Sequence, residues 1–301
     1  MNRRNTPRVS FIGFGEAGQA IASGLRDSGI ERVAAWDILF AQAAGGRLKS
    51  AGAAIGVHCV ASAAEAVRDA DLIVSAVTAA SSLEAARSIA PHLSGAPWYL
   101  DINSVSPGRK QETAKLLGDK ARYIDVAVIA PIHPARHRTP LLIAGPHAED
   151  ASPLLRELGM QLTVVGAETG AAAAIKMIRS VMIKGIEALT LECFLAAQRA
   201  GVLEEVTTSL KNNYPGVDWP KMSEYNLERM ASHGERRAAE MEESAATLRE
   251  LGLDPLMVDA TVQRQREMGA IGKDDAVRAA LARGRSTILD AISAAKNERK
   301  A

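Results

Sequence analysis

The residues best suited to chemistry near the start of the chain are glycines spaced G-x-G-x-x-G. Gly13, Gly15 and Gly18 follow an apolar run and precede an amphipathic one, so a strand should end and a helix begin at them. This spacing permits a tight turn, close approach of the backbone to a pyrophosphate, and close packing of helix on strand. Free amides at the helix N-terminus would then bind the phosphates. We expect a dinucleotide to be held by Gly13, Phe14, Gly15, Glu16, Ala17 and Gly18.

An acidic residue stands at the position where a glycine loop of this spacing predicts a contact with the adenosine ribose. Asp37 ends the run RVAAWD and follows Gly18 by 19 positions. Its carboxylate can accept hydrogen bonds from both ribose hydroxyls and would repel a 2′-phosphate, which favours NAD as cofactor over NADP. Arg47 leaves NADP open, because its side chain could fold back toward this position. A helix cap or turn at Asp37, and a purely structural bend at the glycines, are the alternatives.

The elements that must position this loop alternate along the first half of the chain. Alanine-rich stretches at helical spacing separate β-like runs, a pattern typical of a parallel sheet covered by helices. Ser62 is expected to cap one helix and Gly29 to end another. The β-like runs are RVSFIGF, RVAAWD, DLIVSAV, WYLDIN, RYIDVAVIA, TPLLIAG and QLTVVG, the last of which ends at Gly166.

Polar residues at the ends of two of these strands are candidates for the ligand-binding edge. Val77 and Thr78 follow DLIVSA, and we expect them to line the nicotinamide side of the site, because open α/β sheets bind ligands at the carboxyl ends of their strands. Asn103 and Ser104 follow WYLDI in the same way. A simple turn leading into a helix at Pro107 is the alternative for this pair.

The second half of the sequence has a different, helical character. One alanine-rich stretch runs from Glu168 to Ala200 and ends at Gly201, and further helices are expected around 203–212, 220–251 and 255–268. The predicted fold is therefore a Rossmann-type doubly wound α/β domain over residues 1–166, followed by an all-α domain over residues 167–301. The second domain should begin with a long interdomain helix, contribute to the substrate site, and bury its apolar faces in a homodimer.

Composition limits the possible partners. The 36 basic and 35 acidic residues give a formal charge of +1, which does not favour nucleic acid or anionic lipid. Cys59 and Cys193 lack metal or redox spacing, and no apolar stretch approaches the roughly 20 residues that span a bilayer. The start MNRRNTPRVSFIGFG has no small-residue cleavage site, so we expect no targeting segment. Two cysteines without metal or redox spacing favour a reduced, cytoplasmic setting. No metal site is expected, because Pro134 interrupts the spacing of His133 and His137.

The glycine loop together with DINSVSP, DVAVIAP, LLIAG and GAAAAIKMIRS makes the chain resemble the β-hydroxyacid dehydrogenases, which include 6-phosphogluconate dehydrogenase and 3-hydroxyisobutyrate dehydrogenase. The similarity runs in order over roughly the first two-thirds of the chain. The remainder, with HGERRAAEMEES and LGLDP, resembles a little-characterised 6-phosphogluconate dehydrogenase-like branch. The resemblance implies NAD(P)-linked interconversion of a small β-hydroxy acid and its keto acid in a cleft between the domains, with decarboxylation left open.

The resemblance also implies roles for single residues. Lys176 matches the lysine that takes the hydroxyl proton as hydride leaves and returns it in the reverse reaction. Its apolar neighbours would disfavour a charged ammonium, whereas the alternative is a lysine that reaches from its helix to water. Asn103 and Ser104 match the position that holds the substrate carboxylate and hydroxyl.

Ser180 departs from the family pattern, which carries a substrate-binding asparagine four residues after the lysine. A hydroxyl reaches less far and offers one donor, so the substrate must differ or water must fill the gap. A plain helix-face serine is the alternative. Farther along, His233 and Arg237 lie on a polar stripe that could clamp a substrate carboxylate or phosphate, or could be a solvated helix face.

Two other functions remain open at this point. Related sequences reduce imines when the lysine position is changed, and the retained Lys176 argues against that chemistry. A sensor or scaffold that binds NAD(P) without turnover is the non-enzymatic alternative. The small-molecule substrate itself, expected to be a carboxylate, is not identified by the fold, because function depends on the site.

Overall fold

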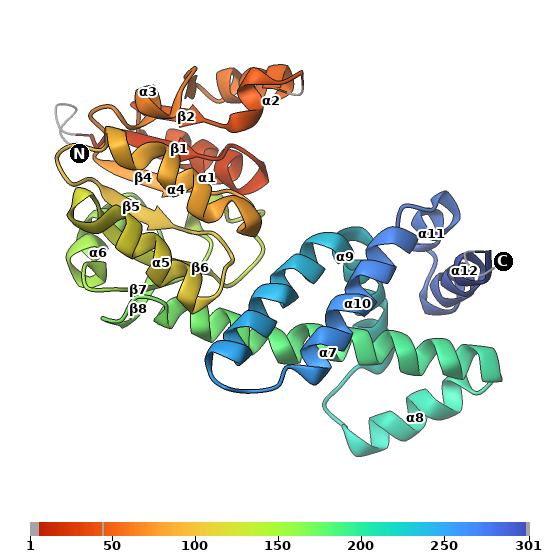
Figure 1. Ribbon diagram of the computed structural model, residues 1–301. Coiled ribbons are helices and arrows are strands. Elements are labelled where there is room, and N and C mark those ends of the chain that lie inside the picture. The colour runs from red at the N-terminus through yellow and green to blue at the C-terminus, as the bar shows by residue number, and fades with distance from the viewer. Residues whose placement is uncertain (1–5, 44, 299–301) are drawn as a thin grey trace. The chain divides into compact units, whose positions relative to one another are not determined.

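The computed structural model describes residues 6–43 and 45–298. The expectation of no targeting segment concerns the start of the chain, and residues 1–5 lie outside the described residues. The chain divides into two compact units, residues 1–176 and 177–301, and the division falls inside the long helix α7 (Ala171–Ala200). Figure 1 shows an N-terminal unit built on a sheet and a C-terminal unit of helices. The predicted domain boundary after residue 166 stays a prediction.

An eight-stranded sheet forms the centre of the N-terminal unit, in the order β3-β2-β1-β4-β5-β6-β7-β8. Neighbouring strands are parallel, except that β7 runs antiparallel to β6. The strands are β1 (Val9–Ile12), β2 (Val33–Trp36), β3 (His58–Cys59), β4 (Leu72–Ser75), β5 (Trp98–Asp101), β6 (Arg122–Val128), β7 (Leu141–Ala144) and β8 (Leu162–Gly166).

Two strands go beyond the sequence prediction. The direction of the run TPLLIAG was left open, and its strand β7 runs antiparallel to β6, because the connection between them holds only the short 3-10 helix η5 (Arg136–Arg138), whereas a parallel crossover needs a longer, usually helical, segment. The two-residue β3 is missing from the prediction, since so short a strand has no detectable period. All seven predicted β-like runs contain a strand.

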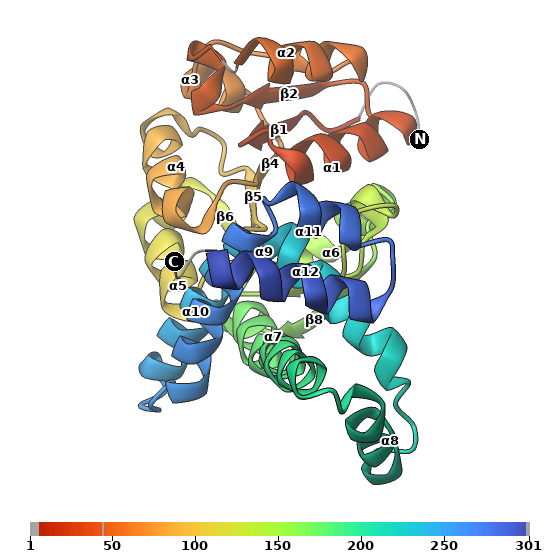
Figure 2. The same ribbon diagram turned by 90° about the vertical axis from the view of Figure 1, so that its right-hand side faces the viewer.

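Helices cover both faces of this sheet (Figures 1 and 2). Side chains alternate between the faces, so Phe11 packs with α1 and α6 while its neighbour Ile12 packs with α3, α4 and α5. Ser62 caps α3 by accepting the Glu65 amide at 3.2 Å, and Gly29 follows α1 with a φ of +91°, which confirms both predicted helix ends. The helices are α1 (Glu16–Asp27), α2 (Gly45–Ala54), α3 (Ala63–Val67), α4 (Ser82–Ile89), α5 (Pro107–Leu117) and α6 (Ala148–Glu157).

The C-terminal unit packs the rest of α7 with five further helices around an apolar core that includes Phe194, Met230 and Ile271. Helices α9 and α10 cross closely, because a Cβ on Gly234 or Gly269 would collide with the backbone of the other helix. No helix in the described residues combines the length and hydropathy that crossing a membrane requires. The five helices are α8 (Leu203–Asn213), α9 (Trp219–Glu250), α10 (Leu256–Ile271), α11 (Asp275–Ala280) and α12 (Arg285–Glu298).

The predicted fold class, a Rossmann-type α/β domain followed by an all-α domain, is confirmed by this arrangement. The helices expected around 203–212, 220–251 and 255–268 correspond to α8, α9 and α10. The sequence predictions do not extend to α11 and α12. Gly201, with a φ of +72°, ends α7 as expected.

His137 in η5 is wedged between α1 and the end of α6. The residue is 5% exposed, and its Nε2 lies 3.1 Å from the Ser28 hydroxyl oxygen. The ring fits because Gly24 has no side chain, since a Cβ there would collide with the imidazole. Burial lowers the pKa of His137, and the nearby charges of Arg138 and Arg136 lower it further. The folded protein therefore favours the neutral ring.

We predict that protonation of His137 destabilises the N-terminal unit. Because its pKa is lowered on folding, the unfolded chain binds the proton more readily, so stability falls as the pH drops through about 6.5 and below. His137→Gln should lose less stability than the parent between about pH 7 and 5, because it has no ring to protonate. Urea unfolding at each pH measures the difference, with the exposed His92→Gln as control. Parallel pH profiles for the parent and His137→Gln would contradict this prediction.

Candidate active site

The glycine loop joins β1 to α1, and two of its glycines are required by the protein's own packing. Gly13 has a φ of +89°, and a Cβ there would lie 2.5 Å from the Ala76 carbonyl oxygen. A Cβ on Gly18 would lie 2.6 Å from the Gly13 carbonyl oxygen. Gly15 differs, because a Cβ there would meet no atom within 4 Å. The packing of this chain therefore explains Gly13 and Gly18 and leaves Gly15 unexplained.

The space at Gly15 fits a bound phosphate. Gly15 is the N-cap of α1 and makes no side-chain capping bond. The first amides of a helix have no acceptor within it, and the helix dipole attracts an anion to them. A pyrophosphate could approach the backbone at Gly15, Glu16 and Ala17 only if no side chain stood at Gly15. The loop thus fits the phosphate cradle that its spacing predicts.

Asp37 fixes this loop to the end of β2. Its Oδ2 accepts the Phe14 amide at 2.7 Å, and its Oδ1 accepts the Leu39 amide at 2.9 Å, so the carboxylate also caps the short helix that follows β2. Each oxygen keeps a second lone pair, and the half-buried carboxylate can still accept ribose hydroxyls. Phe14 itself is fully buried against Phe11 and Phe40. Its ring packs in the apolar core next to the loop, and its amide already donates a hydrogen bond to Asp37.

Asn103 ties the ends of β4 and β5 together. Its Oδ1 accepts the Val77 amide at 2.7 Å, and its Nδ2 donates to the Ser75 hydroxyl at 2.9 Å. Only 4% of the residue is exposed, so the carboxamide mainly holds the two strand ends in place. Thr78 is exposed at the same edge and donates its hydroxyl to Ser81 at 3.0 Å.

Lys176 reaches this edge from the first turns of α7. Its Nζ donates a hydrogen bond to the Ser104 hydroxyl oxygen, with 2.5 Å between the two atoms, and both residues are half-buried. Ser104 directly follows Asn103, which contacts Val77, which in turn lies against Gly13. The structure therefore brings the predicted lysine and the predicted strand-end residues to the edge that carries the glycine loop.

A buried ion cluster lies beneath the contact between Lys176 and Ser104. Asp101 and Asp125 are opposite each other in the register of β5 and β6, where like charges repel. Lys110 from α5 lies between them, with its Nζ 3.2 Å from Asp101 Oδ1 and 3.5 Å from Asp125 Oδ1. All three residues are 0% exposed. The single ammonium thus offsets two carboxylates that are shielded from water.

The two carboxylates of this cluster reach both sides of the site. Asp101 Oδ1 accepts the amide of Asn103 at 3.0 Å and so orients the turn that ends in Ser104. Asp125 Oδ2 accepts the amides of Gly170 and Ala173, both at 3.1 Å, and so caps α7. One cluster therefore fixes both the turn that carries the serine and the helix that carries the lysine.

Sequence reasoning missed this cluster, although a signal was present. Asp101 and Asp125 each stand inside a strongly apolar run, WYLDIN and RYIDVAVIA, where a charge requires a partner. Tyr123 adds a further contact, because its hydroxyl donates to Asp101 Oδ2 at 2.8 Å. Burial raises the pKa of Tyr123 well above its ordinary value, and the charges of Asp101 and Asp125 raise it further, so the phenol keeps its proton.

Ser180 lies in the helical unit, one turn beyond Lys176 on α7. Lys184 Nζ donates to the Ser180 hydroxyl at 3.2 Å and pairs with Glu240 at 3.0 Å. Burial lowers the pKa of Lys184, while the carboxylate of Glu240 opposes that change. The hydroxyl that replaces the expected asparagine therefore has an ammonium beside it, which the sequence analysis did not foresee.

Arg237 is engaged inside the helical unit. It is 6% exposed, and its guanidinium pairs with Glu187, which also accepts from Gln265 at 2.9 Å. A ligand carboxylate would have to compete with Glu187 for this arginine. His233 is half-buried and lines a separate cavity described below. In the described ranges, 6–43 and 45–298, no three His, Cys, Asp or Glu residues are grouped to hold a metal ion.

Comparison with known proteins finds two family models along the chain. Residues 8–104 match the NADP oxidoreductase, coenzyme F420-dependent, family. Residues 197–268 match a domain of unknown function, DUF1932. The first match covers the glycine loop, Asp37 and Asn103, and the second lies in the helical unit.

Solved structures are similar over nearly the whole chain. A conserved hypothetical protein from Sinorhizobium meliloti 1021 is 36% identical, with 97% of each chain covered and a TM-score of 0.78. The conserved protein MTH1747, of unknown function and described as structurally similar to 3-hydroxyacid dehydrogenases, is 30% identical over 87% of this chain and 97% of that one, with a TM-score of 0.70. Mycobacterium tuberculosis 3-hydroxyisobutyrate dehydrogenase shares the fold at 17% identity, with 96% and 99% covered and a TM-score of 0.69.

We predict that the buried cluster needs its cation. Lys110→Met leaves two buried carboxylates uncompensated and should lower the free energy of unfolding by about 3–5 kcal/mol. Lys115→Met makes the same change on the exposed side of α5 and should cost no more than about 0.5 kcal/mol. Urea denaturation followed by circular dichroism measures both. Equal stability of the two variants would show that Lys110 does not hold the cluster together.

Proposed function

The chain belongs to the β-hydroxyacid dehydrogenase-like superfamily of NAD(P)-binding oxidoreductases, and from this premise we propose that it interconverts a small β-hydroxy acid and the corresponding keto acid. The observation that carries the proposal is the 2.5 Å contact between Lys176 Nζ and Ser104 Oγ. This contact lies at the sheet edge that also carries the glycine loop, so an acid/base group and a cofactor site share one edge of the N-terminal unit.

The residues of this edge fit a nicotinamide dinucleotide. The backbone of Gly15, Glu16 and Ala17 would bind the pyrophosphate, and Asp37 the adenosine ribose. Val77 and Thr78 would line the nicotinamide end. The carboxylate of Asp37 is held in place by two backbone amides and would repel a 2′-phosphate, so we propose NAD as the preferred cofactor.

Proton transfer is assigned to Lys176. A bound nicotinamide supplies the hydride acceptor in oxidation and the hydride donor in reduction. In the direction of oxidation, neutral Lys176 Nζ takes the proton of the substrate hydroxyl as the C–H electron pair leaves and the C=O bond forms. In reduction, the ammonium returns that proton to the oxygen of the carbonyl.

Ser104 is the substrate contact best supported by the geometry. Its hydroxyl orients Lys176 and can also donate to a substrate oxygen. Asn103 acts mainly by holding Val77 and Ser75, so we propose that it positions the edge and contacts substrate less directly. Ser180, His233 and Arg237 stay predicted contacts of the substrate.

We predict that turnover depends on Lys176. Purified protein is screened with small β-hydroxy acids and with NAD+ or NADP+, and the absorbance of the reduced cofactor is followed. Lys176→Ala should lower kcat by about 10²–10⁴-fold, because it removes the acid/base group. Ser104→Ala should lower kcat less, by about tenfold, because it removes only the group that orients the amine. Lys115→Ala, an exposed lysine on α5, should match the parent.

Two results would count against the proposal. If Lys176→Ala kept the parental kcat, proton transfer would not pass through this amine. If the protein bound NAD+ tightly, as measured by calorimetry, but turned over no hydroxy acid, the sensor or scaffold alternative would be favoured.

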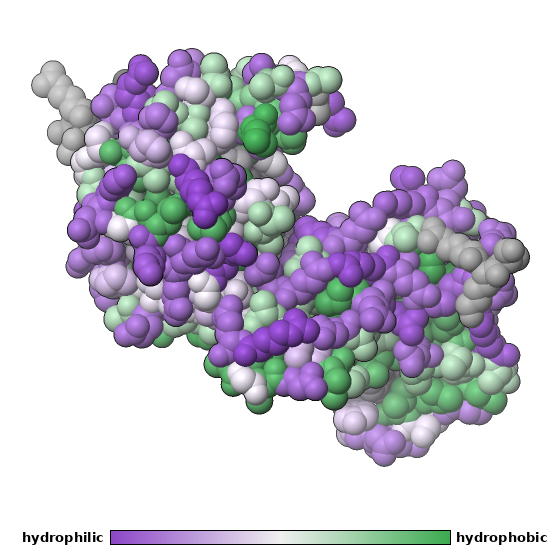
Figure 3. All heavy atoms as spheres, viewed as in Figure 1, coloured by the Kyte–Doolittle hydropathy of each residue, from purple (hydrophilic) through white to green (hydrophobic). Residues whose placement is uncertain are grey.

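We also propose that the helical unit forms a homodimer along α7. Ile178, Met182 and Leu189 on this helix are between 48% and 65% exposed, and Ile183 and Ile186 beside them are also exposed. They recur at spacings of three and four residues, the pattern of a helix face that packs against another helix. Figure 3 shows apolar surface on the α7 and α8 side of the unit. A continuous apolar face of this kind is typical of a protein interface.

Charge placed on this face should prevent the association. We predict that Met182→Asp with Leu189→Asp gives a monomer in sedimentation velocity at micromolar concentration, where the parent is a dimer. Tyr225→Asp changes an exposed side chain of α9 and serves as the control that stays dimeric. A monomeric parent, or a dimer in the double variant, would contradict the proposed interface.

A further inference from the structure

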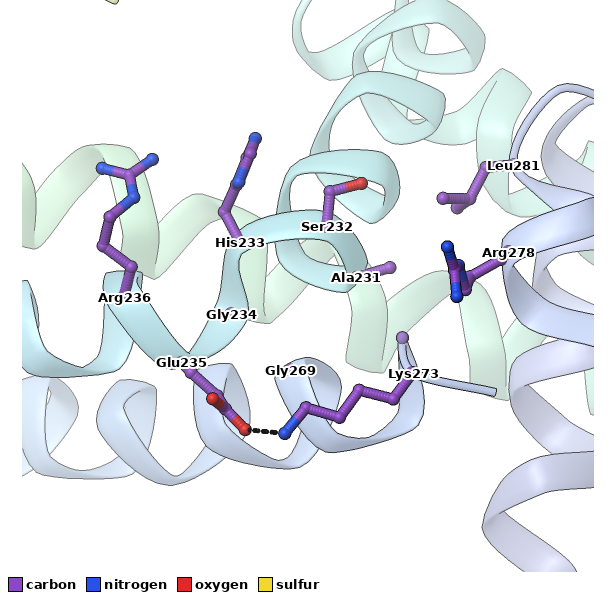
Figure 4. Close-up of a pocket in the computed structure, with 11 residues that line it drawn as sticks. Ala231, Ser232, His233, Gly234, Glu235, Arg236, Gly269, Lys273, Arg278 and Leu281 are labelled. Atoms are coloured by element: carbon purple, nitrogen blue, oxygen red, sulfur yellow. Dashed lines mark hydrogen bonds and ion pairs between the residues drawn. The ribbon is translucent and has the colours of Figure 1, made fainter. Parts of the chain in front are cut away.

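A cavity of about 670 Å³ opens on the helical unit between α9, the end of α10 and α11 (Figure 4). Its size lies within the roughly 300–1,000 Å³ of small-molecule sites. Gly234 and Gly269 line it where the two long helices cross, and Gly272 lies at the end of α10 against Ala231. These glycines let the backbones pack closely along one side of the cavity, because a Cβ on any of them would collide with backbone atoms of the facing segment.

The cavity is lined by cations from three separate elements. Arg236 comes from α9, Lys273 from the turn after α10, and Arg278 from α11. Glu235 is the carboxylate among the lining residues, and His233 adds an imidazole. The whole chain carries a formal charge of only +1, so this positive charge is a local concentration.

The ion pairs of Lys273 and Arg278 are exposed and can be exchanged. Lys273 lies 2.5 Å from Glu235, with the two side chains 70% and 62% exposed, and Figure 4 shows this pair at the edge of the cavity. Arg278 lies 3.6 Å from Asp275, which is almost fully exposed. Exposed pairs of this kind contribute little to stability. A ligand with more negative charge can therefore displace them at little cost.

Arg236 keeps donors for a ligand although it is paired. It lies 2.7 Å from Glu240, but that carboxylate is shared with the buried Lys184. A guanidinium has five N–H donors, and the hydrogen bond to Glu240 Oε1 uses one of them. Figure 4 shows Arg236 at the opposite end of the cavity from Arg278 and pointing away from it, whereas Lys273 and Arg278 come from neighbouring segments, so these two can reach one anionic group.

The arrangement favours phosphate over carboxylate. A carboxylate is planar and is satisfied by a single guanidinium through two parallel bonds. A phosphate carries more charge and presents its oxygens in several directions, so the cations of two elements, Lys273 and Arg278, can contact it together. The cavity is larger than one phosphate group and leaves room for an attached organic group. We propose that this cavity binds a small phosphate ester, a site that does not depend on the redox reaction proposed above.

Calorimetric titration with inorganic phosphate tests the site. The titration uses the full chain carrying Gly15→Asp, whose new carboxylate occupies the open space at the glycine loop and blocks phosphate there. We expect saturable binding that weakens at least tenfold when Lys273→Gln and Arg278→Gln are added. The matched control adds Lys211→Gln and Arg249→Gln, which remove two exposed cations of the same unit outside the cavity, and should bind as Gly15→Asp alone does.

Three results would overturn the proposal. They are the lack of saturable phosphate binding, equal weakening in both charge-removal variants, and competition by acetate as strong as that by phosphate at matched ionic strength. Thermal melting verifies that each variant is folded, which is expected because the changed side chains are exposed. A protein that binds phosphate here but oxidises no hydroxy acid would contradict the redox proposal alone.

Discussion

Two carboxylates that face each other inside a sheet cannot both stay charged unless a cation joins them. Asp101 and Asp125 are placed in this way, and Lys110 is the cation. A well-packed apolar cluster could be as stable, so stability alone does not explain the three charges. Asp101 also accepts an amide of the turn that leads to Ser104, and Asp125 accepts two amides at the start of the helix that carries Lys176. The cluster therefore fixes the turn that carries Ser104 relative to the helix that carries Lys176.

Hydrogen bonds within the protein also hold the glycine loop in place. Asp37 bonds the loop to the end of β2, and Asn103 bonds the ends of β4 and β5 to each other. The loop also touches β4 directly at Gly13. These contacts are complete within the protein, so the edge is formed before any ligand binds. Binding energy then need not be used to assemble the site, which is the physical benefit of preorganisation.

The sequence predicted those features that depend on local spacing. The strand, turn and helix at Gly13, Gly15 and Gly18 follow from spacing alone, and the seven longer strands follow from apolar runs. The direction of β7 does not, because it depends on how the chain turns after β6. The position of Asp125 opposite Asp101 could not be predicted either, because it depends on the register of β5 and β6. The contacts of Asn103 could not be predicted for the same reason, because its carboxamide bonds to Val77 and Ser75 at the end of another strand.

Neighbouring arginines on α9 illustrate why the helical unit is harder to interpret from sequence. Arg236 and Arg237 differ by one position, which is about 100° around a helix. Arg237 is turned inward and is paired with Glu187, where the ion pair holds α7 and α9 together, whereas Arg236 is exposed and lines the cavity of the helical unit. A buried pair with few alternatives is suited to fixing helix packing, and an exposed guanidinium keeps donors for other partners. The sequence Glu-Arg-Arg contains both functions, and only the packing of the helix assigns each arginine to one of them.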